Sequence, residues 1–217
     1  MQYVEETRAR FNTRCAWARD HPEEVLYINI DGMDQLKTAI PRLPSWSKAD
    51  DVGVRLTTKL LGAIVYGRGY WGFWSIPEWA ASSNLTLTAV CKILRDVSGR
   101  SSHDSELPRT ARCLPPRLFL QMDNTARDNK NHYLLGFCAM LLNEGIFQEV
   151  EVHFLPVGHT HTDIDQTFSL IGSRLREEGA FSMPHLMRLV SRGWSMHTSI
   201  GNPHKVHERL DHVLDFR

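Results

Sequence analysis

The sequence predicts an α/β fold in which a mixed sheet is flanked by helices. Several short runs alternate apolar and polar side chains, which is the period of a half-buried strand. Other runs carry apolar side chains at spacings of three and four residues, as at Leu87, Val90, Cys91 and Leu94, which is the helical period. Both patterns occur along a chain of 217 residues, a length that favours one domain of ordinary size.

The first elements expected are a helix, a strand and a hairpin. Residues 1–20 form a charged helical pattern that starts without a cap. Residues 26–31 alternate strictly and predict a strand that ends at Asp31-Gly32. Residues 36–51 contain prolines and serines and are expected to be a loop. Residues 56–74 predict a hairpin around the turn Gly67-Arg68-Gly69.

Helices and strands alternate in the second half. We expect helices over 84–97, 129–143, 163–178 and 184–197, strands over 118–123 and 150–154, and a loop over 98–116. Ser83 or Asn84 is the candidate cap of the first of these helices. Gly145 and Gly179 follow two of them, where glycine commonly ends a helix. Three antiparallel strands followed by alternating helices and strands is the order of ribonuclease-H-like folds, and this is the fold predicted.

The domain organisation expected is one core with two short flanks. Residues 1–21 are interpreted as a helix that ends an upstream region, because the helical pattern begins without a cap. Residues 22–198 form the ribonuclease-H-like core, and residues 199–217 are expected to be a polar tail.

Composition limits the classes of partner. Lysine plus arginine number 25 and aspartate plus glutamate also number 25, so a protein dominated by phosphate contacts is not indicated, although a local basic patch remains compatible. The four cysteines are scattered without a CxxC pair, which argues against a zinc ribbon and fits a reducing compartment. No apolar run approaches the roughly 18 residues of a membrane span. We therefore expect an intracellular protein with no membrane partner.

Three acidic groups occupy meaningful places in this order. Asp31 ends the first strand, and Asp123 ends the strand after the 84–97 helix. Either Asp163 or Asp165 opens a late helix; about 200° separates them on a helical wheel, so only one is expected to reach the site. In a ribonuclease-H-like sheet the first and fourth strands are neighbours, which would place Asp31 beside Asp123.

Three converging carboxylates are the ligands that a two-metal phosphoryl-transfer site requires. They supply hard oxygen ligands for two Mg²⁺ or Mn²⁺ ions about 3.5–4 Å apart. Each acid also has a purely structural interpretation. Asp31 could be a turn residue, Asp123-Asn124 could begin an Asx turn, and Asp165 stands three residues after Thr162, the spacing of a capping box.

Two histidines precede the late helix in Gly158-His159-Thr160-His161. They are candidates for groups that position an acid, a water molecule or a phosphate. A histidine pair after an apolar strand also occurs in binuclear metallohydrolases, where imidazoles bind transition metals, so Zn²⁺ stays open as a less favoured cofactor. Asn124, Lys37 and Lys130 are further candidates for contacts with an acid or a substrate phosphate.

Three motifs together resemble a known family. They are Ile30-Asp31-Gly32-Met33-Asp34-Gln35-x-Lys37, then Gln121-Met122-Asp123-Asn124 with Asn129-Lys130-Asn131, then Pro156-Val157-Gly158-His159-Thr160-His161-x-Asp163-Ile164-Asp165-Gln166-x-Phe168-Ser169. Over roughly residues 20–198 they are similar to an uncharacterised, transposon-derived eukaryotic domain family that resembles DDE-type transposase and integrase cores. The third motif is the most specific.

The resemblance implies a metal-dependent DNA cleavage or strand-transfer domain in the nucleus. Asp31, Asp123 and either Asp163 or Asp165 would form the acidic triad, with DNA as the partner and self-association as a further expectation. Two alternatives stand beside it. One is a binuclear metallohydrolase that uses His159 and His161 as primary ligands. The other is an inactive or domesticated domain that keeps the fold as a binding module, which the zero net charge and the absence of a recognisable DNA-binding module favour.

Overall fold

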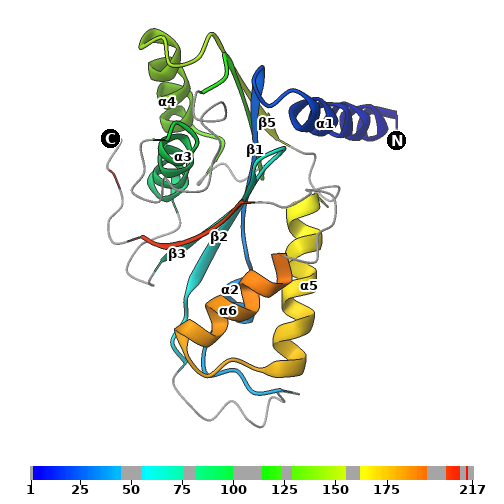
Figure 1. Cartoon of the computed structure of the whole chain (residues 1–217), viewed down its shortest axis with the longest axis vertical. Helices are drawn as coiled ribbons and strands as arrows, with labels where there is room; N and C mark the ends of the chain where they lie inside the picture. The colour runs from blue at the N-terminus through cyan, green and yellow to red at the C-terminus, as the bar shows by residue number, and fades with distance from the viewer. Residues whose placement is uncertain are drawn as a thin grey trace.

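A six-stranded mixed sheet is the centre of the molecule (Figure 1). The computed structural model describes residues 2–44, 55–75, 82–99, 114–123, 129–154, 162–194, 204–210 and 214. The strands are β1 (Val25–Gly32), β2 (Lys59–Val65), β3 (Gly69–Ser75), β4 (Arg117–Met122), β5 (Glu149–Phe154) and β6 (His204–Arg209). The helices are α1 (Gln2–Asp20), α2 (Gln35–Thr38), α3 (Ser83–Val97), α4 (His132–Asn143), α5 (Asp163–Glu178) and α6 (Met183–Trp194).

The strand order is β5-β4-β1-β2-β3-β6. Strand β2 is antiparallel to both β1 and β3, whereas β4 pairs in parallel with β1 on one side and with β5 on the other. The first five strands therefore have the arrangement of a ribonuclease-H-like sheet, and the fold class predicted from the order of elements is confirmed.

Alternation along β1 divides the core into two layers. Leu26, Ile28 and Ile30 pack in one apolar cluster with buried residues of α3 and α4, and Val25 and Tyr27 pack in a second with α1, α5 and α6. Figure 1 shows α3 and α4 on one side of the sheet and the other three long helices on the opposite side. Because successive side chains of a strand point to opposite faces, Asp31 lies on the face that α1 and α5 cover.

Helix α1 is part of this structure and not a separate flank. Its apolar residues Phe11, Cys15 and Ala18 are buried in the second cluster. The segment expected to be a polar tail also differs from the prediction, because it contributes β6, which pairs in parallel with β3 and extends the sheet.

Several element boundaries differ from those predicted. The residue at the N-cap of α3 is Ser82 and not Ser83 or Asn84, and its side chain makes no capping hydrogen bond. Helix α4 begins at His132 because the Asn131 side chain accepts hydrogen bonds from the next two free backbone N–H groups, those of Tyr133 and Leu134. The predicted loop 36–51 includes most of the short helix α2, and residues 45–51 lie outside the described part.

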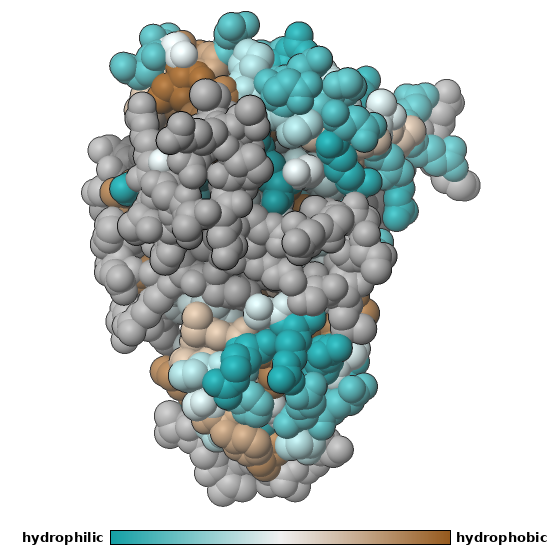
Figure 2. Space-filling model, viewed as in Figure 1, coloured by the Kyte–Doolittle hydropathy of each residue, from teal (hydrophilic) through white to brown (hydrophobic). Residues whose placement is uncertain are grey.

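Helix α4 presents apolar side chains to solvent as well as to the core. Leu135 is 63% exposed, Met140 and Leu142 are each more than 40% exposed, and so is Ile146, which follows the helix. Figure 2 shows hydrophobic surface over the part of the molecule where Figure 1 places α4. Within the described residues, none of the helices combines the length and hydropathy needed to span a membrane.

Helix α5 approaches β2 closely because position 62 is a glycine. A Cβ atom placed there would lie 2.8 Å from the Phe168 ring and 3.3 Å from Cδ1 of Ile164. Gly62 is the residue that pairs with Asp31 across β1 and β2. The missing side chain therefore lets the first turns of α5 lie against the sheet beside the end of β1.

We expect Gly62→Ala to lower the free energy of unfolding by about 1–3 kcal/mol, because the added methyl group displaces Phe168 in a packed core. Gly136→Ala is the control: position 136 is an exposed site in α4 with no atom within 4 Å of its Cβ, so alanine there should stabilise by about 0.5–1 kcal/mol. Urea unfolding of both variants measures the difference. Equal stability of Gly62→Ala and wild type would contradict the close approach.

Candidate acidic site

Asp31 and Asp123 lie at the ends of two neighbouring parallel strands. The last residues paired between β1 and β4 are Asn29 and Gln121, and both acids stand two positions further along their strands. Neighbouring strands are about 4.8 Å apart, so the two carboxylates extend side by side from the same face. Both line one cavity of about 180 Å³.

Asp165, in the first turn of α5, is close enough to Asp31 for its charge to act on it. Its negative charge acts on Asp31 together with that of Asp123. The Asp165 Oδ2 atom also accepts hydrogen bonds from the Thr162 backbone N–H at 2.9 Å and from the Thr162 hydroxyl at 3.0 Å. The capping-box spacing seen in the sequence is therefore real, and it holds Asp165 in the first turn of α5.

Asp163 has different surroundings. Its Oδ2 atom accepts a hydrogen bond from the Tyr66 hydroxyl at 3.2 Å and lies 3.5 Å from a terminal nitrogen of Arg19. These contacts tie the N-terminus of α5 to α1 and to the end of β2. The two acids that the sequence left open thus have different surroundings: the charge of Asp165 acts on Asp31, whereas Asp163 contacts Tyr66 and Arg19.

Buried polar groups surround the contacts of Asp163 with Tyr66 and Arg19. The pKa of the Cys15 thiol is raised to about 12, chiefly by burial, with a contribution from the nearby charge of Asp163. Burial also raises the pKa of Tyr66 well above its usual range and that of Tyr70 to about 12. The thiol and both phenols therefore stay neutral at physiological pH, so Arg19 is the charged partner of Asp163 in this cluster.

Asp123 is held by a buried amide. Asn129 is 8% exposed, and its Nδ2 group donates to Oδ1 of Asp123. The Asn129 Oδ1 atom accepts from the Thr86 hydroxyl of α3 at 3.3 Å. This chain of hydrogen bonds orients the amide so that its donor faces Asp123, and it links α3 to the acidic pair.

Asp31 is the acid of this site whose pKa is strongly raised. Its pKa is raised to about 7, chiefly by burial and to a smaller extent by the charges of Asp165 and Asp123, while the hydrogen bond from the Gly32 backbone N–H opposes the rise. That bond joins Gly32 N and Asp31 Oδ1 at 2.8 Å. Burial and the two neighbouring carboxylates both disfavour the ionised form of Asp31, and a cation placed beside it would favour that form.

The donor set fits hard divalent cations, with one geometric limit. Within the described residues, only His21, Glu23 and Glu24 bring three ligand atoms within 4.8 Å of one another. Asp31, Asp123 and Asp165 therefore do not enclose a single ion as they stand. A pair of ions about 3.5–4 Å apart does not require this, because the three carboxylates can share two ions between them.

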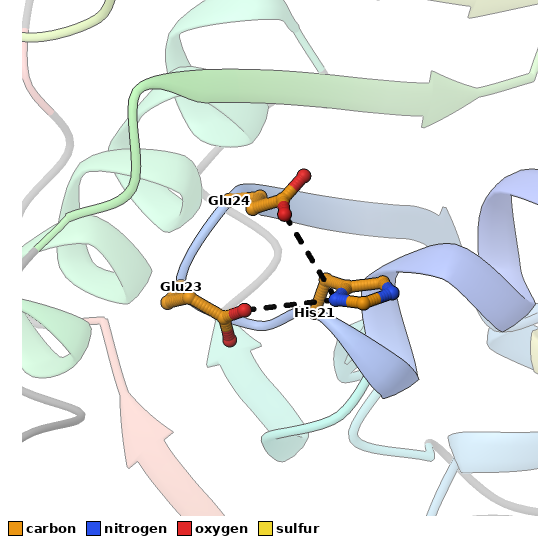
Figure 3. A group of neighbouring side chains, drawn as sticks. All are labelled: His21, Glu23 and Glu24. Carbon is orange, nitrogen blue, oxygen red and sulfur yellow. Dashed lines mark ion pairs between the residues drawn. The ribbon is translucent and has the colours of Figure 1, made fainter.

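The His21 group is an unsuitable alternative. His21 Nδ1 lies 3.6 Å from Glu23 and 3.9 Å from Glu24, and all three side chains are exposed in the turn before β1 (Figure 3). Exposed ion pairs of this kind contribute little and are common without a metal. The turn is at the opposite end of β1 from Asp31.

The other predicted site residues are not brought to the acids, or fall outside the described part. Asn124, His159 and His161 are outside it. The Lys37 stem lies near Gly172, two turns along α5 from Asp165. The Lys130 ammonium lies 5.6 Å from the centre of the Phe154 ring, at the end of β5. Neither lysine lines the acidic cavity.

The polar lining residues that were not predicted as functional include Gln35, Lys59, Thr86 and Asn129. Lys59 begins β2 and Thr86 lies in the first turn of α3, so only the folded sheet brings them near Asp31. Gln35 and Asn129 stand inside the motifs around Asp31 and Asp123. Their polar side chains next to the acids were the one available signal.

One family profile, described as a domain of unknown function (DUF7869), matches residues 48–217. The chain belongs to this family. The matched segment contains Asp123 and Asp165 but begins after Asp31. A search of curated proteins finds none that matches.

We expect Asp31→Asn to stabilise the metal-free protein by about 1–3 kcal/mol at about pH 8. The native state keeps a proton on Asp31 up to a pH of about 7, whereas the unfolded chain releases it near pH 4. Native stability therefore falls as the pH rises between these values, and asparagine does not incur the loss.

Urea unfolding in EDTA at a series of pH values measures this difference. The advantage of Asp31→Asn should disappear below about pH 4, where both states of the wild type are protonated. An advantage of equal size at every pH, or a variant less stable than wild type at about pH 8, would contradict the raised pKa.

Proposed function

We propose that this domain catalyses metal-dependent phosphoryl transfer on DNA, by cleavage or strand transfer, with Asp31, Asp123 and Asp165 as the acidic triad. The observation that carries the proposal is the parallel register of β1 and β4, which aligns Asp31 with Asp123 on the face where α5 presents Asp165. The fold supports it, because ribonuclease-H-like sheets carry catalytic acids at this edge in the proteins that the sequence motifs resemble.

Each residue of the candidate site has a definite task in this proposal. The three carboxylates hold the cations, which when bound would activate the attacking oxygen and stabilise the leaving oxygen. Asn129 orients Asp123, and Thr162 orients Asp165. Asp31 gives up its proton when positive charge is placed beside it, because a cation offsets the repulsion from Asp123 and Asp165.

The transposon-derived origin, the DNA substrate, the nuclear location and self-association belong to the same proposal. They rest on the three sequence motifs and on the agreement of the fold with a DDE-type core. Mg²⁺ or Mn²⁺ is the cofactor proposed, since the acids that face one another in the described residues offer oxygen and no nitrogen or sulfur.

We expect Asp31→Asn and Asp123→Asn each to weaken Mn²⁺ binding by at least about tenfold, because each removes a charged ligand. Asp165→Asn should do the same. Isothermal titration with Mn²⁺ measures affinity, and cleavage of supercoiled plasmid in Mg²⁺ or Mn²⁺ measures activity, which the three variants should lose.

Asp163→Asn is the matched control, since it makes the same change two positions from Asp165. It should bind Mn²⁺ like wild type while unfolding at a lower temperature, because the Arg19 contact is weakened. Unchanged Mn²⁺ affinity in Asp31→Asn and Asp123→Asn would overturn the proposal. If Mn²⁺ binding is lost only when His159 and His161 are replaced, the protein is a binuclear metallohydrolase. If wild type binds no metal at all, the inactive or domesticated binding domain is the function favoured.

A further inference from the structure

Helix α4 carries a second apolar stripe besides the one that packs in the core. The buried stripe consists of Leu134, Phe137, Cys138 and Leu141. On a helical wheel Leu135, Ala139 and Leu142 lie within about 60° of one another and about 120° around the helix from the buried stripe. We call these three residues, together with Ile146 in the turn that follows the helix, the outer stripe.

The outer stripe is exposed to solvent in a single chain. Leu135 is 63% exposed, Leu142 and Ile146 are each 41% exposed, and Ala139 is exposed as well. Hydrophobic surface is visible over this helix in Figure 2. The exposed area of the four side chains is on the order of 300 Å², within the range of the largest apolar patches on monomeric proteins, which often have a function.

Helix α4 is also uncharged along its whole length. The twelve residues from His132 to Asn143 include no aspartate, glutamate, lysine or arginine. Helix α5 shows the ordinary pattern, because Arg176, Glu177 and Glu178 occupy its exposed positions. A helix that is apolar on more than its core face is expected to be buried on more than one side. The sequence of α4 therefore fits a helix with a second packing partner.

The spacing and the charge of the outer stripe favour a second copy of this chain as that partner. Leu135, Ala139 and Leu142 are separated by four and then three residues, which is the spacing through which two like helices interdigitate. Because the stripe is uncharged, two identical stripes can meet without like-charge repulsion. A charged partner would find no complementary group on it.

The area of the outer stripe agrees with a small dimer. Two stripes in contact would bury about 600 Å² of apolar surface, and with the polar rim that interfaces carry the total would be about 1,000 Å². This total is at the lower limit for a specific interface. It corresponds to a weak dimer that forms and dissociates with concentration, and not to an obligate one.

We propose that two copies of this protein associate through the outer stripes of their α4 helices, in a symmetric pair with a dissociation constant of about 1–100 μM. The inference supplies a surface for the self-association that the proposed function includes, and it rests on that function in this respect alone. Its evidence comes from α4 and not from the acids.

Such a pair would fix two acidic sites relative to each other. Helix α4 begins three residues after Asn129, whose side chain contacts Asp123. The Asn131 side chain, which caps α4, also contacts the Ser83 hydroxyl of α3 at 2.6 Å. The start of α4 is therefore held to the structure around the acidic cavity, and a contact between two α4 helices sets the separation of the two cavities.

The test measures self-association without metal. Sedimentation velocity is recorded in EDTA from about 5 to about 300 μM protein, which brackets the expected dissociation constant. We expect Leu135→Glu and Leu142→Glu each to weaken association at least about tenfold, because each places two like charges in the interface. Both should keep the wild-type melting temperature in dilute solution, and Leu135→Gln or Leu142→Gln serves where a glutamate variant does not fold.

Met140→Glu is the matched control. Met140 is 43% exposed on the same helix but lies about 130° around it from the outer stripe. This variant should associate like wild type. An equal loss in Met140→Glu would indicate non-specific hydrophobic contact and overturn the proposal, as would a wild-type protein that stays monomeric up to about 300 μM.

A mixing experiment identifies the partner as a second copy. Leu135→Glu is mixed with Leu135→Lys, which would meet it in a parallel pair of helices, or with Leu142→Lys, which would meet it in an antiparallel pair. One mixture should associate at least about tenfold more tightly than either variant alone, because opposite charges then face each other. If neither mixture does so, two α4 helices do not face each other.

Mn²⁺ binding separates this inference from the proposed function. Leu135→Glu should bind Mn²⁺ like wild type, and Asp31→Asn should self-associate like wild type. Loss of association with Mn²⁺ affinity intact therefore concerns α4 alone, and the Mn²⁺ titrations of the aspartate variants judge the acidic site.

Discussion

The parallel pairing of β1 with β4 is the constraint on which the candidate site depends. It joins a strand from the first quarter of the chain to one from the middle, and its register decides which side chains become neighbours. A shift of one residue would reverse the face to which each side chain of β4 points and would separate Asp123 from Asp31. The apolar alternation of Leu118, Leu120 and Met122 against the first core layer prevents that shift, so hydrophobic packing on one face fixes the geometry of charged groups on the other.

Helix α5 adds the third acid through two kinds of restraint. Gly62 and the Ile164 and Phe168 side chains set how near the helix lies to the sheet. The Asp163 contacts with Tyr66 and Arg19 fix the position of the first turn of α5. Asp165 then has little freedom, because Thr162 holds its carboxylate from the other side. The local cap and the tertiary contacts agree, and both favour one position for this side chain.

Much of the arrangement could be predicted because it follows from alternation and order. The parity of residues along β1 and β4 placed Asp31 and Asp123 on one face, and the order of elements indicated neighbouring strands. The choice between Asp163 and Asp165 could not be made, since both flank Ile164 and only the position of Tyr66 and Arg19 distinguishes them. Strand β6 was missed because His204-Lys205-Val206-His207-Glu208-Arg209 has a single apolar residue, and its pairing depends on the free edge of β3. Lys59 and Thr86 reach the cavity only through the hairpin and α3, which no local pattern encodes.

The family match and the folded unit begin at different places. The matched segment starts at residue 48, yet β1, which ends at Gly32, lies between β2 and β4 in the middle of the sheet. A polypeptide cut to the matched boundaries would lose its central strand and also α1, leaving β2 and β4 with unpaired backbone groups along their inner edges. Such edges recruit strands from other molecules. Recombinant fragments designed from the family boundary alone should therefore precipitate or exchange strands, and a folded protein requires the chain from α1 onward.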